Sequence, residues 1–259
     1  MSSTSKPTTA APWRTPLESN LTAHSTTSFT LSTATLDPKT HLPTPRSRTC
    51  ELRGFFPTPP LHPSALQALR AQNVPLNPAL YEGDLLSLTT DARMEKTAQL
   101  RESGGAVEAV FWVKGAMVQW RVRGCAFAIG GGGEEEGVAR ERIMGRLRRV
   151  TETTGDDKDW DWERLVTAYF ANMSPVMRGT FTAPPPGQPR SQVPANPNYK
   201  MGEPLEDLRD PVARANFRVV VILPDEVERL DLSDNANVTR RQWTLGPENG
   251  EWVEEELWP

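Results

Sequence analysis

The prolines of this chain are divided between its two ends. Twelve of the 24 lie at or before Pro78 and twelve at or after Pro175, so none lies in the stretch from Tyr81 to Ser174. Proline has no amide hydrogen for a sheet ladder, and it breaks helix interiors. This distribution predicts that regular structure is concentrated in the middle of the chain and that the two flanks are rich in loops.

The composition sets limits on the class of protein. A length of 259 residues with 37% hydrophobic residues and eight Trp is enough for a real core in one or two domains. The formal net charge of -4, without a basic stripe, argues against a nucleic-acid surface. No stretch approaches a membrane span, and the N-terminal residues lack the apolar segment of a secretory signal. We therefore expect a soluble, cytoplasmic protein with no nucleic-acid or membrane partner.

Residues that often carry chemistry are few. Two cysteines and three histidines occur without any metal-ligand spacing, so we expect no metal site. The nucleophile elbow, the Walker A motif, the dinucleotide-binding glycines and the kinase motifs are all absent. Gly130–Gly133 resembles a phosphate loop, but the three glutamates that follow would repel a phosphate. We interpret the glycines as a flexible linker.

Alternating and helical periodicities predict the elements. Strands are expected at 28–36, 46–56, 84–90, 106–113, 117–129, 216–223, 226–232, 238–245 and 251–257, and helices at 11–21, 63–73, 92–102, 138–150 and 160–173. The helix at 138–150 is rich in arginine, which we interpret as a solvated face. Because most neighbouring strands form hairpins, the pattern favours an antiparallel barrel with helices at its rim, an arrangement that removes sheet edges.

The domain organisation follows from the same pattern. We expect a disordered N-terminus at 1–12 and a single domain at 13–259. Two proline-rich inserts interrupt it, one at about 57–80 on the surface and one at 184–211, a long loop or partly disordered segment.

Several cations stand at the expected strand ends and helix starts, namely Arg48, Arg53, Lys96, Arg178 and the pair Arg240-Arg241. A bound phosphate monoester needs about two charges neutralised, and Arg and Lys do this as a planar fork and as a point charge. Each one alone is a common surface residue, but their order and spacing along the chain favour a phosphate site.

Three segments give the chain a family resemblance. Residues 29–33, 48–55 and 89–100 resemble the pyridoxamine 5'-phosphate oxidase-like split β-barrel flavoproteins. The most similar branch carries the motifs TDxRSxKxxQL, EAxFWF, QFRIxG and RxxFxxPPPG, which read here TDARMEKTAQL, EAVFWV, QWRVRG and RGTFTAPPPG. The resemblance runs from about Trp13 to the end of the chain, interrupted by the two inserts.

The resemblance implies a mainly β fold, an antiparallel split β-barrel with peripheral helices, and a homodimer that binds FMN between its subunits together with a small-molecule substrate. Arg48 and Lys96 would hold the FMN phosphate, and Thr89 and Thr90 would add contacts to it. The segment of Arg48, Thr49, Cys50, Leu52 and Arg53 would run beside the isoalloxazine ring. Gln119 would reach the flavin from the other subunit, and Ser174, Arg178 and Arg241 would complete the shell.

The chain departs from the family pattern at two places. Met94 and Glu95 replace the Ser and Arg that help to grip the phosphate. The Arg-x-His pair of the vitamin B6 enzymes corresponds to Asn237 to Thr239 here, so we do not expect oxidation of pyridoxamine phosphate. Two hypotheses stay open: an FMN-dependent oxidoreductase of unassigned substrate, and a non-catalytic flavin-binding or protein-interaction module on the same fold.

Overall fold

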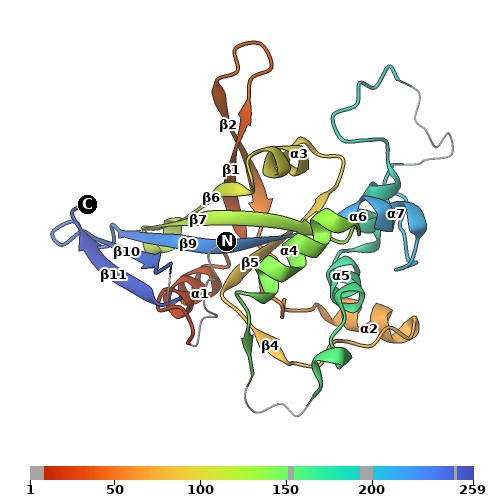
Figure 1. Cartoon of the computed structure of the whole chain (residues 1–259), viewed down its shortest axis with the longest axis horizontal. Helices are drawn as coiled ribbons and strands as arrows, with labels where there is room; N and C mark the ends of the chain where they lie inside the picture. Colours follow the sequence, from red (N-terminus) through yellow and green to blue (C-terminus); the bar gives the residue numbers. More distant parts are fainter. Residues whose placement is uncertain (1–8, 151–154, 193–200, 248–249) are drawn as a thin grey trace.

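The computed structural model describes residues 9–150, 155–192, 201–247 and 250–259 (Figure 1). Its helices are α1 (Arg14–Ala23), α2 (Pro63–Ala71), α3 (Glu95–Glu102), α4 (Glu134–Met144), α5 (Trp162–Ala171), α6 (Pro175–Gly179) and α7 (Pro211–Asn216), with short 3-10 turns η1 (Lys114–Ala116), η2 (Asp157–Asp159) and η3 (Thr180–Thr182). Its strands are β1 (Ser28–Leu36), β2 (Pro43–Glu51), β3 (Gly54–Phe56), β4 (Tyr81–Glu82), β5 (Leu85–Asp91), β6 (Ala106–Val113), β7 (Val118–Ile129), β8 (Arg148–Arg149), β9 (Phe217–Asp231), β10 (Thr239–Leu245) and β11 (Trp252–Leu257).

One nine-stranded antiparallel sheet forms the body of the molecule. Its main path is β11-β10-β9-β7-β6-β1-β2, and β5 pairs with both β9 and β3. The sheet forks along β9, whose first half pairs with β5 and whose second half pairs with β10, while β7 pairs along its other edge. The expected mainly β fold with peripheral helices is confirmed.

The barrel is split between β2 and β5. No ladder joins these two strands in the described part of the chain. Leu52 and Arg53 connect β2 to β3, and β3 pairs with β5. The Leu52 amide donates to the Thr27 carbonyl and the Arg53 amide to the Ser87 carbonyl, both at 2.8 Å. The expectation that closure removes all sheet edges was therefore wrong, because β2 and β11 each pair on one side only among the described strands.

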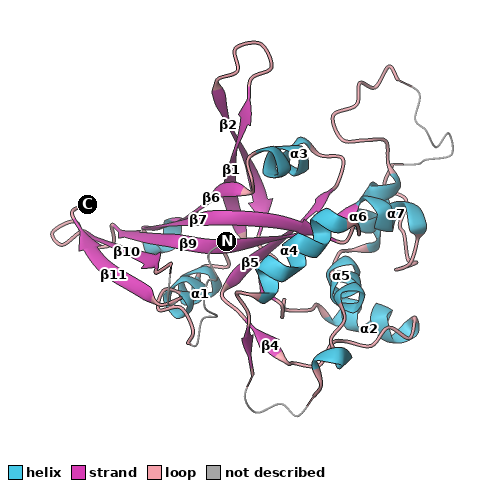
Figure 2. Ribbon diagram, viewed as in Figure 1, coloured by secondary structure: helices cyan, strands magenta, loops and turns pink. Residues whose placement is uncertain are grey.

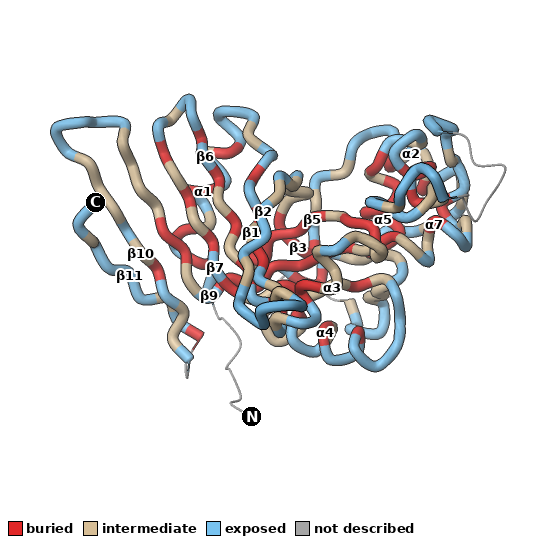
Figure 3. The backbone as a smooth tube through the Cα atoms, turned by 90° about the horizontal axis from the view of Figure 1, so that it is seen from above, coloured by how far each residue is buried: buried red, intermediate tan, exposed pale blue. Residues whose placement is uncertain are grey.

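Two hydrophobic cores lie on opposite faces of β9. Val220 and Ile222 point into the barrel core, which also contains Trp13, the residue before α1. Val219 and Val221 point the other way, into a core shared with α2, α4 and α5. Figure 2 shows α2, α4, α5, α6 and α7 gathered at one end of the sheet and the β10–β11 hairpin at the other. Figure 3 shows that burial is continuous from the central strands into these helices, whereas β10 and β11 are mostly exposed or half-buried.

The strand expected at 216–223 and the one expected at 226–232 are a single strand, β9. Its pairing with β7 shifts register between Arg123 and Gly124, where Gly124 faces Pro224 and Arg123 faces Glu226. This β-bulge accommodates Pro224 within a long strand, because the ladder is already interrupted there.

The helix expected at 138–150 begins and ends earlier, at Glu134 and Met144. Arg148 follows in the two-residue strand β8, where it is only 8% exposed and donates to the Asp84 carboxylate at 2.5 and 3.2 Å. The interpretation of these arginines as one solvated face was wrong for Arg148, because its guanidinium is buried against a carboxylate that is 64 residues distant in sequence.

The two proline-rich inserts are joined to each other. The side-chain amide of Gln72, at the end of α2, donates to the Glu206 carbonyl at 2.7 Å and accepts from the Leu208 amide at 3.0 Å. Leu208 is fully buried, and α2 buries Ala65 and Leu69 in the same core. Helix α2 and the segment around Leu208 are therefore packed onto the domain, whereas residues 185–192 of the second insert are almost all exposed and residues 193–200 lie outside the described structure.

Residues 1–8 of the expected disordered N-terminus lie outside the described structure, whereas Ala11 is buried and its amide donates to the Asp84 carboxylate at 2.9 Å. No helix in the described ranges is both long enough and apolar enough to cross a membrane.

Candidate functional site

A cavity of about 390 Å³ opens beside the split between β2 and β5, within the size range of small-molecule sites. It is lined by β2, the end of β5, the start of α3 and the segment from α5 to the PPPG motif. Six of the twelve residues expected at a cofactor site line it: Thr49, Cys50, Arg53, Thr89, Thr90 and Lys96. These residues come from motifs about 40 residues apart, and the pairing of β3 with β5 brings them together.

Lys96 projects from the first turn of α3 into this cavity. Its ammonium donates to the Thr90 hydroxyl at 2.9 Å and lies 2.9 Å from the Met94 sulfur. Burial lowers the pKa of Lys96, and the nearby positive charge of Arg48 lowers it further. Within the described ranges no carboxylate lies within the 4.0 Å of an ion pair with this ammonium. The Asp91 carboxylate, which also lines the cavity, opposes this lowering of the Lys96 pKa from beyond that distance. A bound anion would therefore meet a charge that is only partly compensated.

Arg48 lies beside the cavity rather than in its wall. Its guanidinium donates to the Thr33 hydroxyl at 2.7 Å and to the Gln99 side-chain carbonyl at 2.6 Å, both of them on buried side chains. Burial lowers the pKa of Arg48. Because its hydrogen-bond acceptors are neutral, its positive charge adds to that of Lys96 at one end of the cavity.

Arg53 separates this cavity from a second one. Its Nε donates to the Thr89 hydroxyl at 3.2 Å, and its side chain lines both cavities. The second cavity, of about 460 Å³, is bordered by α1 and contains Leu52 in its wall. The expected segment from Arg48 to Arg53 therefore runs along the wall of two adjoining hollows.

Cys50 contributes a thiol to the cavity wall. Burial raises the pKa of Cys50, while the positive charges of Lys96 and Arg48 oppose that increase. The thiol is therefore protonated at neutral pH and acts as a small, weakly polar group.

Asp91 and Arg93 hold the PPPG segment against the cavity. Both belong to the TDxR motif, but we assigned them no role from the sequence. Arg93 donates to both carboxylate oxygens of Asp91 and, at 2.7 Å, to the carbonyl of Ala183. This contact fixes the segment whose Pro184 and Pro186 line the cavity. The TDxR motif was the available signal, since a carboxylate and an arginine two residues apart at the end of a strand are placed to pair.

Ser174 and Arg178 lie behind the cavity wall. Ser174 caps α6 by accepting from the Met177 amide at 3.3 Å. Arg178 is 2% exposed and donates to the carbonyls of Leu205 and Met173, each at 2.8 Å. Neither of them lines the cavity, but both hold the backbone from which Met173 and Met177 enter it.

Gln119 and Arg241 are not brought to this cavity within the single chain. Gln119 lies on β7 between Trp112 and Leu230 of the neighbouring strands, and Arg241 on β10 pairs with Glu254 at 3.1 Å. The expectation that Gln119 reaches a flavin from a second subunit stays a prediction.

The amides of the glycine loop bind a carboxylate of the same chain, that of Glu136. The amides of Gly130, Gly131 and Gly132 donate to one oxygen of Glu136 at 3.0, 2.7 and 2.5 Å, and Arg140 donates to the other oxygen. Burial raises the pKa of Glu136, but the glycine amides and Arg140 outweigh it and hold that pKa below its usual value. The interpretation as a flexible linker was wrong: one of the three glutamates binds the loop and closes it.

Residues 10–130 match the family model described as "Pyridoxamine 5'-phosphate oxidase, FMN-binding domain". No curated protein sequence matches the chain.

Two solved structures are similar over nearly the whole length. A pyridoxamine 5'-phosphate oxidase-related FMN-binding protein from Nostoc punctiforme is 20% identical, with 97% of this chain and 99% of that chain covered and a TM-score of 0.61, and it shows a shared fold. PhzG from Burkholderia lata, solved with tetrahydrophenazine-1-carboxylic acid, is 15% identical, with 97% and 94% covered and a TM-score of 0.47.

The fold, the order of the motifs around one cavity and the family model agree. Residues 10–130 match the model of the pyridoxamine 5'-phosphate oxidase FMN-binding domain, which confirms the family resemblance found in the sequence, and the Nostoc punctiforme structure shows the same fold.

Proposed function

We propose that the chain binds FMN in the 390 Å³ cavity and acts as an FMN-dependent oxidoreductase on a small-molecule substrate that is not yet assigned. The observation that carries this proposal is the pair of cations at one end of the cavity: Lys96 lines it and Arg48 lies beside it, and neither forms an ion pair with a carboxylate of the described residues. A phosphate monoester carries close to two negative charges, which two such cations match.

The donor set at that end suits a phosphate. Lys96 would contact the phosphate with its ammonium, and the hydroxyls of Thr90 and Thr89 would add hydrogen bonds. Arg48, beside the cavity, would contribute its positive charge without a direct contact. The wall from Thr49 to Arg53 would then border the flavin ring. When bound, FMN supplies a ring that accepts and donates hydride. The protein's part is to orient that ring and to place positive charge beside the negative charge that reduction creates.

We propose that the active form is a homodimer. In the single chain Gln119 lies on the half-exposed face of β7, away from the cavity, so its expected contact with FMN requires a second copy. Light scattering on the purified protein should give twice the mass of one chain. A monomer that binds FMN would overturn this part of the proposal alone.

A second candidate function is a flavin-binding or protein-interaction module without turnover. Its support is the Met94 sulfur beside Lys96, where the family places a serine hydroxyl, and the negative charge of Glu95, which acts on Arg48 and opposes the lowering of its pKa by burial. Anaerobic reduction by NAD(P)H followed by re-oxidation with added acceptors separates the two functions. Rapid turnover excludes the module, whereas FMN binding without turnover supports it.

The flavin spectrum of the purified protein is the first test. We expect flavin absorbance as purified, or saturable binding of added FMN at micromolar concentration, and absence of both would reject the proposal.

Alkylation of the two cysteines gives an independent test of the location. Cys50 lines the cavity and Cys125 lies on β7 outside it, and burial raises the pKa of both thiols. Added FMN should slow alkylation of Cys50 by iodoacetamide, measured by mass spectrometry, and should leave Cys125 unchanged. Equal rates at Cys50 with and without FMN would place the flavin elsewhere.

A further inference from the structure

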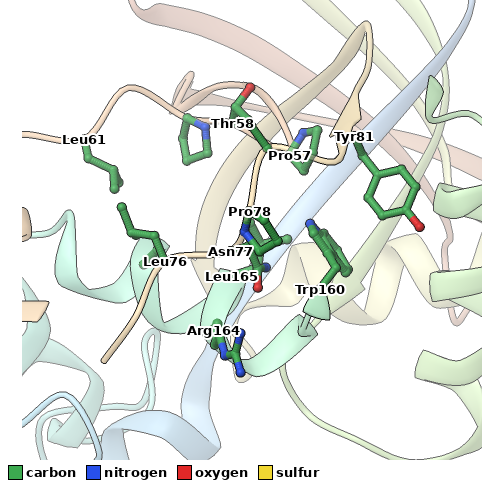
Figure 4. Close-up of a pocket in the computed structure, with 13 residues that line it drawn as sticks. Pro57, Thr58, Leu61, Leu76, Asn77, Pro78, Tyr81, Trp160, Arg164 and Leu165 are labelled. Atoms are coloured by element: carbon green, nitrogen blue, oxygen red, sulfur yellow. The ribbon is translucent and has the colours of Figure 1, made fainter. Parts of the chain in front are cut away.

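A separate cavity of about 190 Å³ lies between the first proline-rich insert and the start of α5 (Figure 4). It shares no lining residue with the cavity proposed for FMN. Pro57 and Pro78 of the insert, Leu165 of α5, and the rings of Tyr81 and Trp160 form its walls, and Arg164 is its one charged lining residue.

The walls of this cavity are fixed by polar and aromatic contacts. The Asn77 side chain donates to the Asp161 carbonyl at 2.7 Å and accepts from the Asp161 amide at 3.0 Å, which joins the insert to the beginning of α5. The Tyr81 and Trp160 rings meet edge to face, with centroids 5.6 Å apart, and Trp160 meets Trp162 in the same way at 4.8 Å. The hollow is therefore formed before any ligand arrives, which lowers the entropic cost of binding.

Its size and lining define an apolar, flat occupant. An engineered apolar cavity of about 150 Å³ accommodates benzene, so 190 Å³ holds one six-membered ring with a small substituent. Proline and aromatic side chains present flat apolar faces to such a ring.

The Arg164 guanidinium supplies the charged hydrogen-bond donors of this cavity. Its Nη1 donates to the Asp159 carbonyl at 3.0 Å, whereas Nε and Nη2 have no hydrogen-bond partner among the described residues. The Asp161 carboxylate accepts the Arg164 backbone amide at 2.7 Å and forms no ion pair with the Arg164 guanidinium. Two free donors on one edge of a guanidinium match the two oxygens of a carboxylate. We propose that this cavity binds a small aromatic carboxylate, with its ring between the insert and α5 and its carboxylate on Arg164.

Calorimetric titration with benzoate tests the proposal, with benzamide as the neutral probe of the same shape. We expect one saturable benzoate site per chain. In the Arg164→Gln variant benzoate should bind roughly tenfold or more weakly, because a charged hydrogen bond is lost, while benzamide binding should not change. Equal loss of both probes, or none of benzoate, overturns the assignment of the carboxylate to Arg164.

Two variants that fill the cavity locate the site. Ala168→Leu fills it from the buried side of α5, and Ala79→Leu fills it from the exposed rim, where a larger side chain does not threaten folding. Both should abolish benzoate binding and leave FMN binding as in the unmodified chain. Benzoate binding that survives Ala79→Leu, or no saturable binding to the unmodified chain, overturns the proposal without bearing on the FMN site.

Discussion

The Lys96 ammonium lies 2.9 Å from the Met94 sulfur. A thioether is a weak acceptor and offers no donor, so Met94 contributes nothing to an anion that Lys96 would attract. The same sulfur accepts the Thr90 hydroxyl at 3.4 Å. Met94 therefore occupies the position at which the family motif carries a serine, and it offers no hydrogen bond to a phosphate that would bind beside Lys96.

We expect Met94→Ser to tighten FMN binding by about 1 kcal/mol, roughly fivefold, since one hydroxyl donor is gained and Thr90 is released from the sulfur. Fluorescence titration with FMN measures the change. Met94→Leu is the matched control, because it removes the sulfur without adding a donor. An equal gain in the leucine variant would show that space, and not the donor, limits affinity.

Removal of either cation should weaken FMN binding. We expect Lys96→Ala to cost about 1.5 to 3 kcal/mol, or roughly 10- to 150-fold in Kd, the range for a charged hydrogen bond. Arg48→Ala should cost less, because Arg48 lies beside the cavity and acts through its charge. Riboflavin lacks the phosphate, so its Kd should be the same in the Lys96→Ala variant as in the unmodified chain. If FMN affinity is unchanged in both variants, the phosphate lies elsewhere.

The family motifs predicted twelve residues at a cofactor site, and six of them line one cavity. β1 has the predicted bounds, and the predicted hairpin is β6 and β7. Thr49 and Cys50 of β2 and Thr89 and Thr90 of β5 line one cavity beside the split, although no ladder joins these two strands among the described residues. Alternation along the strands and the order of the hairpins predicted the elements, whereas the family resemblance predicted the site residues.

Charged residues with distant partners were not predictable in the same way. Arg148 looked like one of several surface arginines, and only the fold places it on Asp84. Arg178 looked like a cofactor ligand, yet it binds main-chain carbonyls at Leu205 and Met173. Local periodicity reports which face of an element is apolar, but it does not report which buried carboxylate or carbonyl a long side chain will reach.

The Arg148–Asp84 pair should be one of the largest polar contributions to stability. Both side chains are buried, and Asp84 also accepts the Ala11 amide, so Asp84→Asn leaves a buried guanidinium without its charged partner. We expect a loss of about 3 to 5 kcal/mol in the free energy of unfolding, measured by urea denaturation. Glu82→Gln is the control: Glu82 pairs with the same arginine at 3.1 Å, but its side chain is 57% exposed, so the loss should stay below about 1 kcal/mol.

The glycine loop should make stability depend on pH through Glu136. Burial raises the pKa of this carboxyl, but amide hydrogen bonds from Gly132 and Gly130, together with Arg140, hold it below its ordinary value of 4.5. A group whose pKa is lower in the folded state stabilises the fold above its unfolded-state pKa, and this contribution is lost as the pH falls through the folded-state value. The loss therefore falls in the range below pH 4.5.

We expect Glu136→Gln to lower the free energy of unfolding at neutral pH by about 1 to 3 kcal/mol, because a buried anion that accepts three amides and an arginine is replaced by a neutral amide. Below pH 4.5 the difference from the unmodified chain should shrink, since its Glu136 becomes protonated there. Urea denaturation across this pH range measures both effects. Glu135→Gln, an exposed neighbour on α4, should change neither, and a difference that is constant with pH would show that the carboxylate charge does not hold the loop.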